Sequence, residues 1–188
     1  MRFAHRLAAV GRIAVFLVAA SSAASASRAH AADPPKLSEK LSALAPFVGK
    51  TWKGNFKSST PEKPMFDASR WEVALKGKAI RITHSVNDGV YGGETLVMWN
   101  PATKQIEAHY FTNAGFFTRS TMEVKDGKIH TREKVTGNAN GITEVEAVTE
   151  LLPSGELHVK SRYYNGKEWA DGHEILYKPA PDAKVSAD

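Results

Sequence analysis

The feature that most constrains the fold is a long series of segments in which apolar and polar residues alternate between short turns rich in Gly, Asn and Pro. An alternation of two residues is the period of a β-strand that turns one face to the interior. The first of these segments begins at Thr51, and no helical pattern interrupts the segments that follow it. The strands expected after it cover 67–75, 79–86, 90–99, 105–112, 116–125, 128–136, 142–152, 156–164 and 167–177.

The short connections determine how these strands are arranged. Strands joined by short turns usually pair with their sequence neighbours in antiparallel fashion, and Asp126-Gly127 is typical of a two-residue hairpin. A meander this long removes its exposed edges by closing on itself. The sequence therefore predicts an all-β, antiparallel up-and-down barrel of about ten strands. A two-sheet sandwich is the alternative that the same strand pattern allows.

A short helical segment precedes the first strand. Leu37, Leu41, Leu44 and Val48 recur at helical spacing, and Pro46 limits how far the helix can continue. Gly49 is suited to the left-handed conformation that ends a helix. We expect a short N-terminal helix that lies across one end of the sheet.

The first 31 residues have the layout of a secretory signal. A basic start is followed by the short apolar run Ile13–Ala20 and by the small-residue cleavage pattern Ala29-His30-Ala31. The apolar run is far shorter than the roughly 20 residues that span a bilayer. We therefore expect a cleaved signal peptide at 1–31, one barrel domain at 32–178, a flexible tail at 179–188, and a periplasmic or secreted location without stable membrane insertion.

Charge and cysteine content exclude several classes of function. The 25 Lys and Arg outnumber the 20 Asp and Glu, but four arginines fall within the expected signal, which leaves 25 − 4 = 21 bases and a net charge of +1. So small an excess gives no support for nucleic-acid binding. The chain has no cysteine, which excludes disulfides and thiolate chemistry. We expect a monomer or a weak homodimer.

The predicted inner face is too polar for a solid hydrocarbon core. Alternation turns His84, Glu133, Asp171 and His173 inward together with several Ser and Thr hydroxyls. An unpaired buried polar group costs about 1–3 kcal/mol, so a core would rarely contain so many. A cavity that holds water and a small molecule explains them, although paired structural side chains are the alternative.

The stretch Gly49-Lys50-Thr51-Trp52-Lys53-Gly54 resembles the glycine–tryptophan start of the calycin barrels, which comprise lipocalins, fatty-acid-binding proteins and nitrobindin-like domains. The short helix, the Phe47-Val48-Gly49 segment and the tryptophan-bearing first strand more specifically resemble a family of uncharacterised exported bacterial domains. This resemblance implies a calycin-like barrel. In nitrobindin-like barrels a histidine on the last strand binds haem iron, which implies His173 as a haem ligand here.

These observations predict a barrel that binds a small, mainly apolar or amphipathic molecule. The residues expected to bind it are Trp71, His84, Tyr110, Phe116, Ser120, Glu133, Tyr163, Trp169, Asp171 and His173. We expect no metal and no cofactor, with haem as the exception that the resemblance implies.

Two alternatives to a simple binding protein stay open: the haem-binding protein that the resemblance implies, and a barrel enzyme. A barrel enzyme of the isomerase or cyclase type would use His84, Glu133 or His173 for acid–base chemistry, since burial tunes such groups toward neutral pH. A serine triad is disfavoured because no nucleophile elbow is present. We therefore assign no catalytic residue.

Overall fold

A computed structural model describes residues 36–137 and 140–187. The expected signal peptide at 1–31 lies outside the described residues. The elements, in chain order, are η1 (Glu39–Phe47), β1 (Lys50–Phe56), β2 (Phe66–Ala74), η2 (Leu75–Gly77), β3 (Ala79–Val86), η3 (Asn87–Gly89), β4 (Tyr91–Asn100), β5 (Gln105–Thr112), β6 (Phe117–Lys125), β7 (Lys128–Thr136), β8 (Glu144–Leu151), β9 (Leu157–Tyr164) and β10 (Trp169–Pro179).

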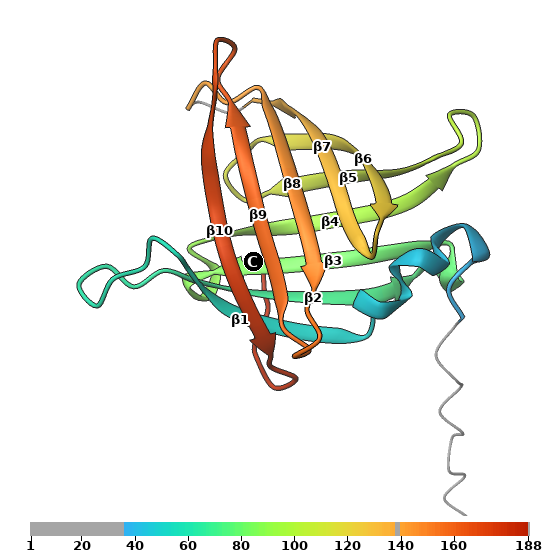
Figure 1. Cartoon of the computed structure of the whole chain (residues 1–188), viewed down its shortest axis with the longest axis horizontal. Coiled ribbons are helices and arrows are strands. Elements are labelled where there is room, and N and C mark those ends of the chain that lie inside the picture. Colours follow the sequence, from blue (N-terminus) through green and yellow to red (C-terminus); the bar gives the residue numbers. More distant parts are fainter. Residues whose placement is uncertain (1–35, 138–139, 188) are drawn as a thin grey trace, which may run out of the picture. The chain divides into compact units, whose positions relative to one another are not determined.

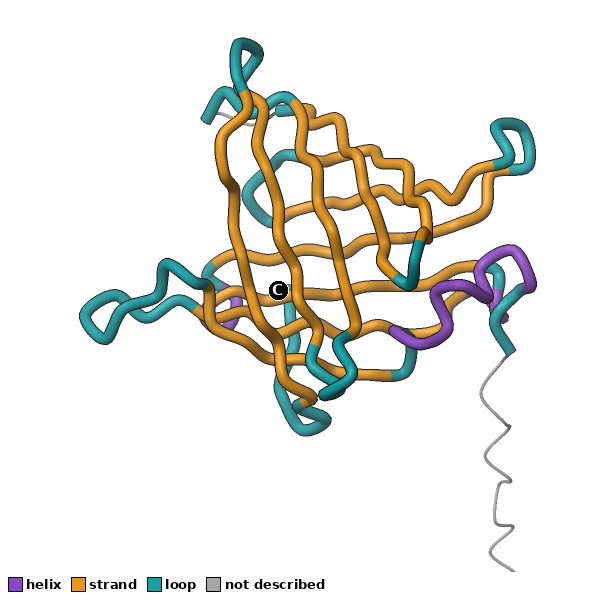
Figure 2. Tube along the Cα trace, in the orientation of Figure 1, coloured by secondary structure: helices purple, strands orange, loops and turns teal. Residues whose placement is uncertain are grey.

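The strands form one closed antiparallel barrel in the order β1-β10-β9-β8-β7-β6-β5-β4-β3-β2. Each strand pairs with its sequence neighbour, and β1 closes the barrel by pairing with both β2 and β10 (Figure 1). The tube in Figure 2 shows β8–β10 crossing in front of β1–β4, with short loops at both ends. The prediction of a ten-stranded up-and-down barrel is confirmed, and the sandwich alternative is wrong.

The hairpin predicted at Asp126-Gly127 is also confirmed. Lys125 pairs directly with Lys128, and the two central residues have φ angles of 52° and 75°. Two consecutive positive φ angles define the turn whose twist matches the flanking strands.

The helix before the barrel is a 3-10 helix, which corrects the expected helical spacing. Its buried residues are Leu41, Leu44 and Phe47, which recur every third residue as the 3-10 period requires. Val48, which the α-helical spacing had included, is only half-buried. The Phe47 and Trp71 rings lie 5.7 Å apart, so the helix covers the barrel end where β1 begins and β2 ends. Gly49 follows with φ +78°, as its predicted left-handed conformation requires.

The barrel interior differs between its two ends. Near η1 it is a tightly packed apolar core, with Trp52, Ile80, Val97 and Leu157 at most 1% exposed. We call this the capped end. The opposite end, where β1 finishes and β4 starts, has among the described helices only the three-residue η3 in the connection between β3 and β4. We call it the open end, and the polar inward side chains gather there.

A β-bulge in β10 changes which residues face inward. Asp171 pairs with Arg162 and Glu174 pairs with Lys160, so Gly172 and His173 together oppose the single residue Ser161. The extra residue inverts the alternation, as bulges do. His173 faces the interior, but the expectation that Asp171 and Trp169 also face inward is wrong, because both precede the inversion.

A side chain at position 172 would crowd its neighbours. A Cβ there would lie 2.4 Å from the Ser161 hydroxyl and 2.9 Å from the Tyr163 ring. Glycine therefore lets the bulge pack closely against Ser161 and Tyr163.

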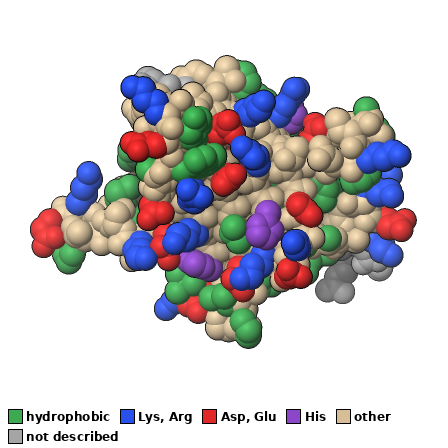
Figure 3. All heavy atoms as spheres, turned by 45° about the horizontal axis from the view of Figure 1, so that its top comes forward, with side chains coloured by type: hydrophobic (Ala, Val, Ile, Leu, Met, Phe, Trp, Pro, Cys, Tyr) green, Lys and Arg blue, Asp and Glu red, His purple; other side chains and the backbone are tan. Residues whose placement is uncertain are grey.

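The outer face of the barrel is polar. Figure 3 shows Lys and Arg side chains interspersed with Asp and Glu over the face in view. Across residues 36–137 and 140–187, no helix has the length and hydropathy needed to cross a membrane.

We expect Gly172→Ala to destabilise the barrel by about 1–3 kcal/mol, because the new methyl group overpacks the bulge. Urea denaturation measures this loss. Ser161→Ala removes the nearest atom, so the double variant should lose less stability than the sum of the two single variants. Simple additivity would contradict this account of the bulge.

Candidate functional site

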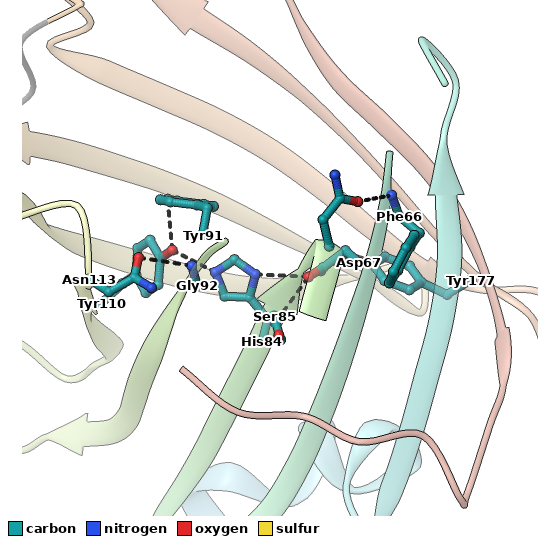
Figure 4. Close-up of polar contacts among 10 residues, drawn as sticks. Phe66, Asp67, His84, Ser85, Tyr91, Gly92, Tyr110, Asn113 and Tyr177 are labelled. Carbon is teal, nitrogen blue, oxygen red and sulfur yellow. Dashed lines mark hydrogen bonds and ion pairs between the residues drawn. The ribbon is translucent and has the colours of Figure 1, made fainter. Parts of the chain in front are cut away.

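A continuous chain of hydrogen bonds crosses the interior of the open half (Figure 4). The Tyr177 hydroxyl donates to Asp67 Oδ2 at 2.6 Å, and Asp67 Oδ1 lies 3.1 Å from His84 Nδ1. His84 Nε2 lies 2.5 Å from the Tyr110 hydroxyl, which lies 2.8 Å from the Tyr91 hydroxyl. Five side chains from five different strands thus form one network.

Two glycines make room for this network. Gly54 of β1 pairs with both Asp67 and Tyr177, and its missing side chain opens the path between them across β1. A Cβ on Gly93 would lie 2.7 Å from the Tyr110 ring. Gly93 also pairs directly with His84, so the phenol lies over this glycine and reaches the imidazole.

The directions of the hydrogen bonds follow from Asp67. Its Oδ1 also accepts the Ser85 N–H at 3.1 Å, so both carboxylate oxygens act as acceptors and His84 Nδ1 is the donor. In a neutral imidazole Nε2 then accepts from Tyr110, whose oxygen accepts from Tyr91. Burial raises the pKa of Tyr110 and of Tyr91, so both remain neutral phenols.

Glu133 on β7 forms a second polar centre. Thr118 donates to its Oε2 at 2.8 Å, while Oε1 has no hydrogen-bond partner among the described residues. Burial raises the pKa of this carboxyl, an effect that the Thr118 hydrogen bond and the nearby His84 only partly oppose. Thr118 pairs directly with Tyr110, which places Glu133 beside the hydrogen-bond chain.

His173 forms a third centre, at the bulge. Its Nδ1 lies 2.5 Å from the Tyr163 hydroxyl and 3.1 Å from Ser161 Oγ. Burial lowers the pKa of this imidazole, which favours its neutral form. Its Nε2 has no partner among the described residues and is the nitrogen that a haem iron would need. The haem alternative stays a prediction.

The open half is not packed solid. His84, Tyr91, Tyr110, Glu133 and Tyr163 all face inward by register, yet each keeps accessible surface. The His84 side chain, for example, is 21% exposed. Inward side chains in a closed barrel cannot reach the outer surface, so their accessible surface borders an interior space. The arrangement thus offers hydrogen-bonding groups to a molecule that enters from the open end.

Aromatic rings frame this space. Phe116 stacks on Tyr91 at 6.3 Å between ring centroids and meets Tyr110 edge-on at 6.4 Å. The Phe56 ring lies edge-on to His173 at 6.0 Å. The site therefore combines polar groups with apolar surface.

Two hollows lie elsewhere on the barrel. One, of about 800 Å³, adjoins Ala43 and Trp99 at the capped end and extends along β5–β8. The other, of about 320 Å³, lies at the bulge, where it is lined by His173 and by the charged residues Lys57, Lys160 and Asp171. Neither is lined by His84 or Glu133, and both include outward-facing residues, so we do not assign the ligand site to them.

The structure brings together most of the residues expected to bind a ligand. The members in the open half are His84, Tyr110, Phe116, Ser120, Glu133, Tyr163 and His173. Trp71 lies instead at the capped end against Phe47. Trp169 lies on the outer face, where its ring is tilted against that of Tyr164 with 5.3 Å between the centroids, and Asp171 is exposed there. The expectation that Trp169 and Asp171 line the interior is therefore wrong, because of the bulge in β10.

Three network residues, Asp67, Tyr91 and Tyr177, were not among those expected to bind a ligand. Asp67 is only 3% exposed. It lies four residues before Trp71 on the same strand, so the alternation that turns Trp71 inward also turns Asp67 inward, and this pattern could have identified it. Tyr91 opens β4 just before Gly92 and Gly93, which obscure the alternation of that strand. A strand start interrupted by two glycines offers little by which to assign a face.

Fold and site together define a class: a closed ten-stranded antiparallel β-barrel, consistent with a calycin-like fold, with a polar and aromatic interior at one end. No known family model matches the chain, and no curated protein matches its sequence. Within the described part of the chain, no group of three or more His, Cys, Asp or Glu side chains is placed to hold a metal ion.

We expect Glu133→Gln to stabilise the protein at high pH. Because burial raises the pKa of Glu133, folded-state stability falls as pH rises from the ordinary value of 4.5 through the folded pKa. Glutamine avoids this loss and still accepts from Thr118. Urea denaturation should show a gain of about 1–3 kcal/mol at pH 8 and none at pH 4.

Glu123→Gln is the matched control, because Glu123 is exposed on the outer face of β6. It should change stability little at either pH. A gain for Glu133→Gln that is the same at pH 4 and pH 8 would contradict the raised pKa.

Proposed function

We propose that this protein binds a small amphipathic molecule inside the open half of its barrel. The observation that supports this most is the set of inward polar side chains that keep accessible surface. A purely structural interior would bury and pair its polar groups, as Asp67 does. Glu133 Oε1 and His173 Nε2 instead have no partner among the described residues and are available to a ligand.

The distribution of residues favours an amphipathic ligand over a mainly apolar one. Around Ile80 and Val97, both fully buried, the capped end is filled by its own side chains, and the hollow of about 800 Å³ at that end lies along β5–β8. The open half offers hydroxyl, imidazole and carboxyl groups beside the rings of Phe116 and Tyr91. The polar part of the ligand would meet Glu133, Tyr91 and His173, and its apolar part would contact the rings.

Export to the periplasm or the exterior belongs to the same proposal. It is supported by the basic start, the short apolar run and the small-residue cleavage pattern within residues 1–31. A soluble carrier or receptor for a small molecule is a function suited to that location. The expectation of a monomer or weak homodimer likewise stays a prediction.

Two adjacent phenylalanines provide a direct test of binding. Phe116 contacts Tyr91 and Tyr110 inside the barrel, whereas Phe117 is 44% exposed and packs on Phe111 outside. Titration with Nile red, a neutral probe whose fluorescence rises in apolar surroundings, measures binding. We expect Phe116→Ala to weaken binding about ten-fold or more, as loss of a buried aromatic contact does.

Phe117→Ala removes the same side chain from the outer face and should leave the affinity for Nile red unchanged. Equal losses in the two variants would place the probe on the surface. Failure of the wild-type protein to bind Nile red or any other small probe would argue against the proposed function.

Acid–base catalysis is a second candidate, favoured by the chain from Asp67 through His84 to two phenols. A carboxylate that orients an imidazole, which in turn accepts from a phenol, resembles the way enzymes position proton donors. Glu133, whose pKa is raised by burial, is suited to act as a general base. Such a site would abstract a proton from the carbon next to a substrate carbonyl.

Isomerisation of 3-cyclohexen-1-one to its conjugated isomer, followed by ultraviolet absorbance, tests this candidate. An enzyme of this kind should accelerate the reaction over buffer, and Glu133→Gln should lower the rate by about 10²-fold or more. Glu123→Gln should retain the wild-type rate. A rate equal to that of buffer would leave binding as the supported function.

A further inference from the structure

The charges inside the barrel are unusually one-sided. The inward positions of the ten strands carry two carboxyl groups, Asp67 and Glu133, and two imidazoles, His84 and His173. Among the described strand residues, Lys50 is the single inward Lys or Arg, and it lies exposed at the capped end. The ligand site at the open end therefore contains acids but no permanent cation.

This composition disfavours an anionic ligand. A carboxylate taken from water into the barrel would lose its hydration and find no Lys or Arg to compensate it. It would also be repelled by Asp67, whose two oxygens are already occupied as acceptors. The interior is thus poorly suited to the free acid of a fatty acid.

The two carboxyls have different roles. Asp67 accepts from Tyr177, His84 and the Ser85 backbone, and these contacts satisfy it within the barrel wall. Glu133 accepts only from Thr118, through Oε2, and its Oε1 is unpartnered among the described residues. Glu133 is therefore the carboxyl that can interact with a ligand.

Electron-rich groups lie close to Glu133. Thr118, its hydrogen-bond partner, pairs directly with Tyr110, and the Tyr110 ring meets Phe116. Phe116 in turn stacks on Tyr91. The faces of such rings attract ammonium groups, most strongly where water is excluded.

The hydrogen-bond chain also ends in an acceptor on this side. When His84 is neutral, Tyr110 donates to it and Tyr91 donates to Tyr110, so the remaining lone pairs of the Tyr91 oxygen are free to accept. A ligand that donates N–H bonds complements both this oxygen and Glu133 Oε1.

We propose that the ligand is a small amine with an apolar substituent, whose ammonium group pairs with Glu133 and lies against the rings of Phe116 and Tyr91. This assignment rests on the proposed binding function and specifies the chemistry of its ligand. The apolar substituent would occupy the space between these rings and the capped core.

The proposal implies a dependence on pH. Burial raises the pKa of Glu133, and an ammonium group beside it would restore ionisation, so binding should release protons. The other titratable groups facing this space are Asp67, His84, Tyr91, Tyr110, Tyr163 and His173. An alkylammonium stays charged up to about pH 10, so the affinity should rise with pH above the range in which free Glu ionises.

Three probes of equal chain length separate the possibilities. Isothermal titration calorimetry at pH 7.5 would compare octylamine, 1-octanol and octanoate with the wild-type protein, with Glu133→Gln and with Glu123→Gln. We expect octylamine to bind about ten-fold or more tighter than 1-octanol, as a hydrogen bond to a charged group implies, and octanoate to bind weakest. Glu133→Gln should remove the preference for octylamine, whereas Glu123→Gln should retain it.

The order of the three affinities for the wild-type protein tests the amine assignment even if Glu133→Gln does not fold. Tighter binding of octanoate or 1-octanol than of octylamine would overturn the amine assignment and leave the binding function standing. Failure of all three probes to bind would overturn both. Octylamine binding of equal strength in Glu133→Gln, with circular dichroism showing a folded variant, would also overturn the role given to Glu133.

Discussion

The barrel depends on one buried carboxylate at its closure. Asp67 is 3% exposed and would be costly to desolvate alone, yet it accepts from groups on β3 and β10 as well as lying on β2. Between β2 and β10 lies β1, the strand that closes the barrel. Because Gly54 has no side chain, Tyr177 reaches Asp67 across β1. One carboxylate thus joins three strands around the seam and orients His84 for the site.

The barrel interior has two halves with different roles. The half at the capped end stabilises the fold, and the half at the open end holds the proposed binding site. The 3-10 helix and the buried Leu41, Leu44 and Phe47 complete an apolar core at the capped end. The open half keeps polar groups that are incompletely paired, and Glu133 costs folding free energy whenever it is ionised. A small barrel can tolerate this cost because the packed half supplies most of the burial.

The sequence was sufficient for the strands and turns because their signals are local. The alternation of residues and turns such as Asp126-Gly127 predicted ten strands to within a few residues. The site was only partly predictable, because the register of the strands decides which side chains face the interior. One extra residue at Gly172-His173 turned Asp171 and Trp169 outward, and the need for glycine there arises from contacts with Ser161 and Tyr163 on another strand. The alternation shared with Trp71 indicates that Asp67 faces inward, but its role was not predictable, because its partners His84 and Tyr177 lie on other strands.

The closure of the barrel also determines when the chain can finish folding. Trp52 of β1 pairs with Pro179 of β10, so the first strand of the barrel gains its second neighbour only from the last. Until β10 is present, β1 and β9 are two unpaired edges, and Asp67 lacks the Tyr177 hydroxyl. Contacts so distant in sequence form slowly, since the loop they close must be ordered first. The barrel therefore cannot close until its last strand is available, and substitutions that weaken the pairing of β10 with β1 leave two strand edges open.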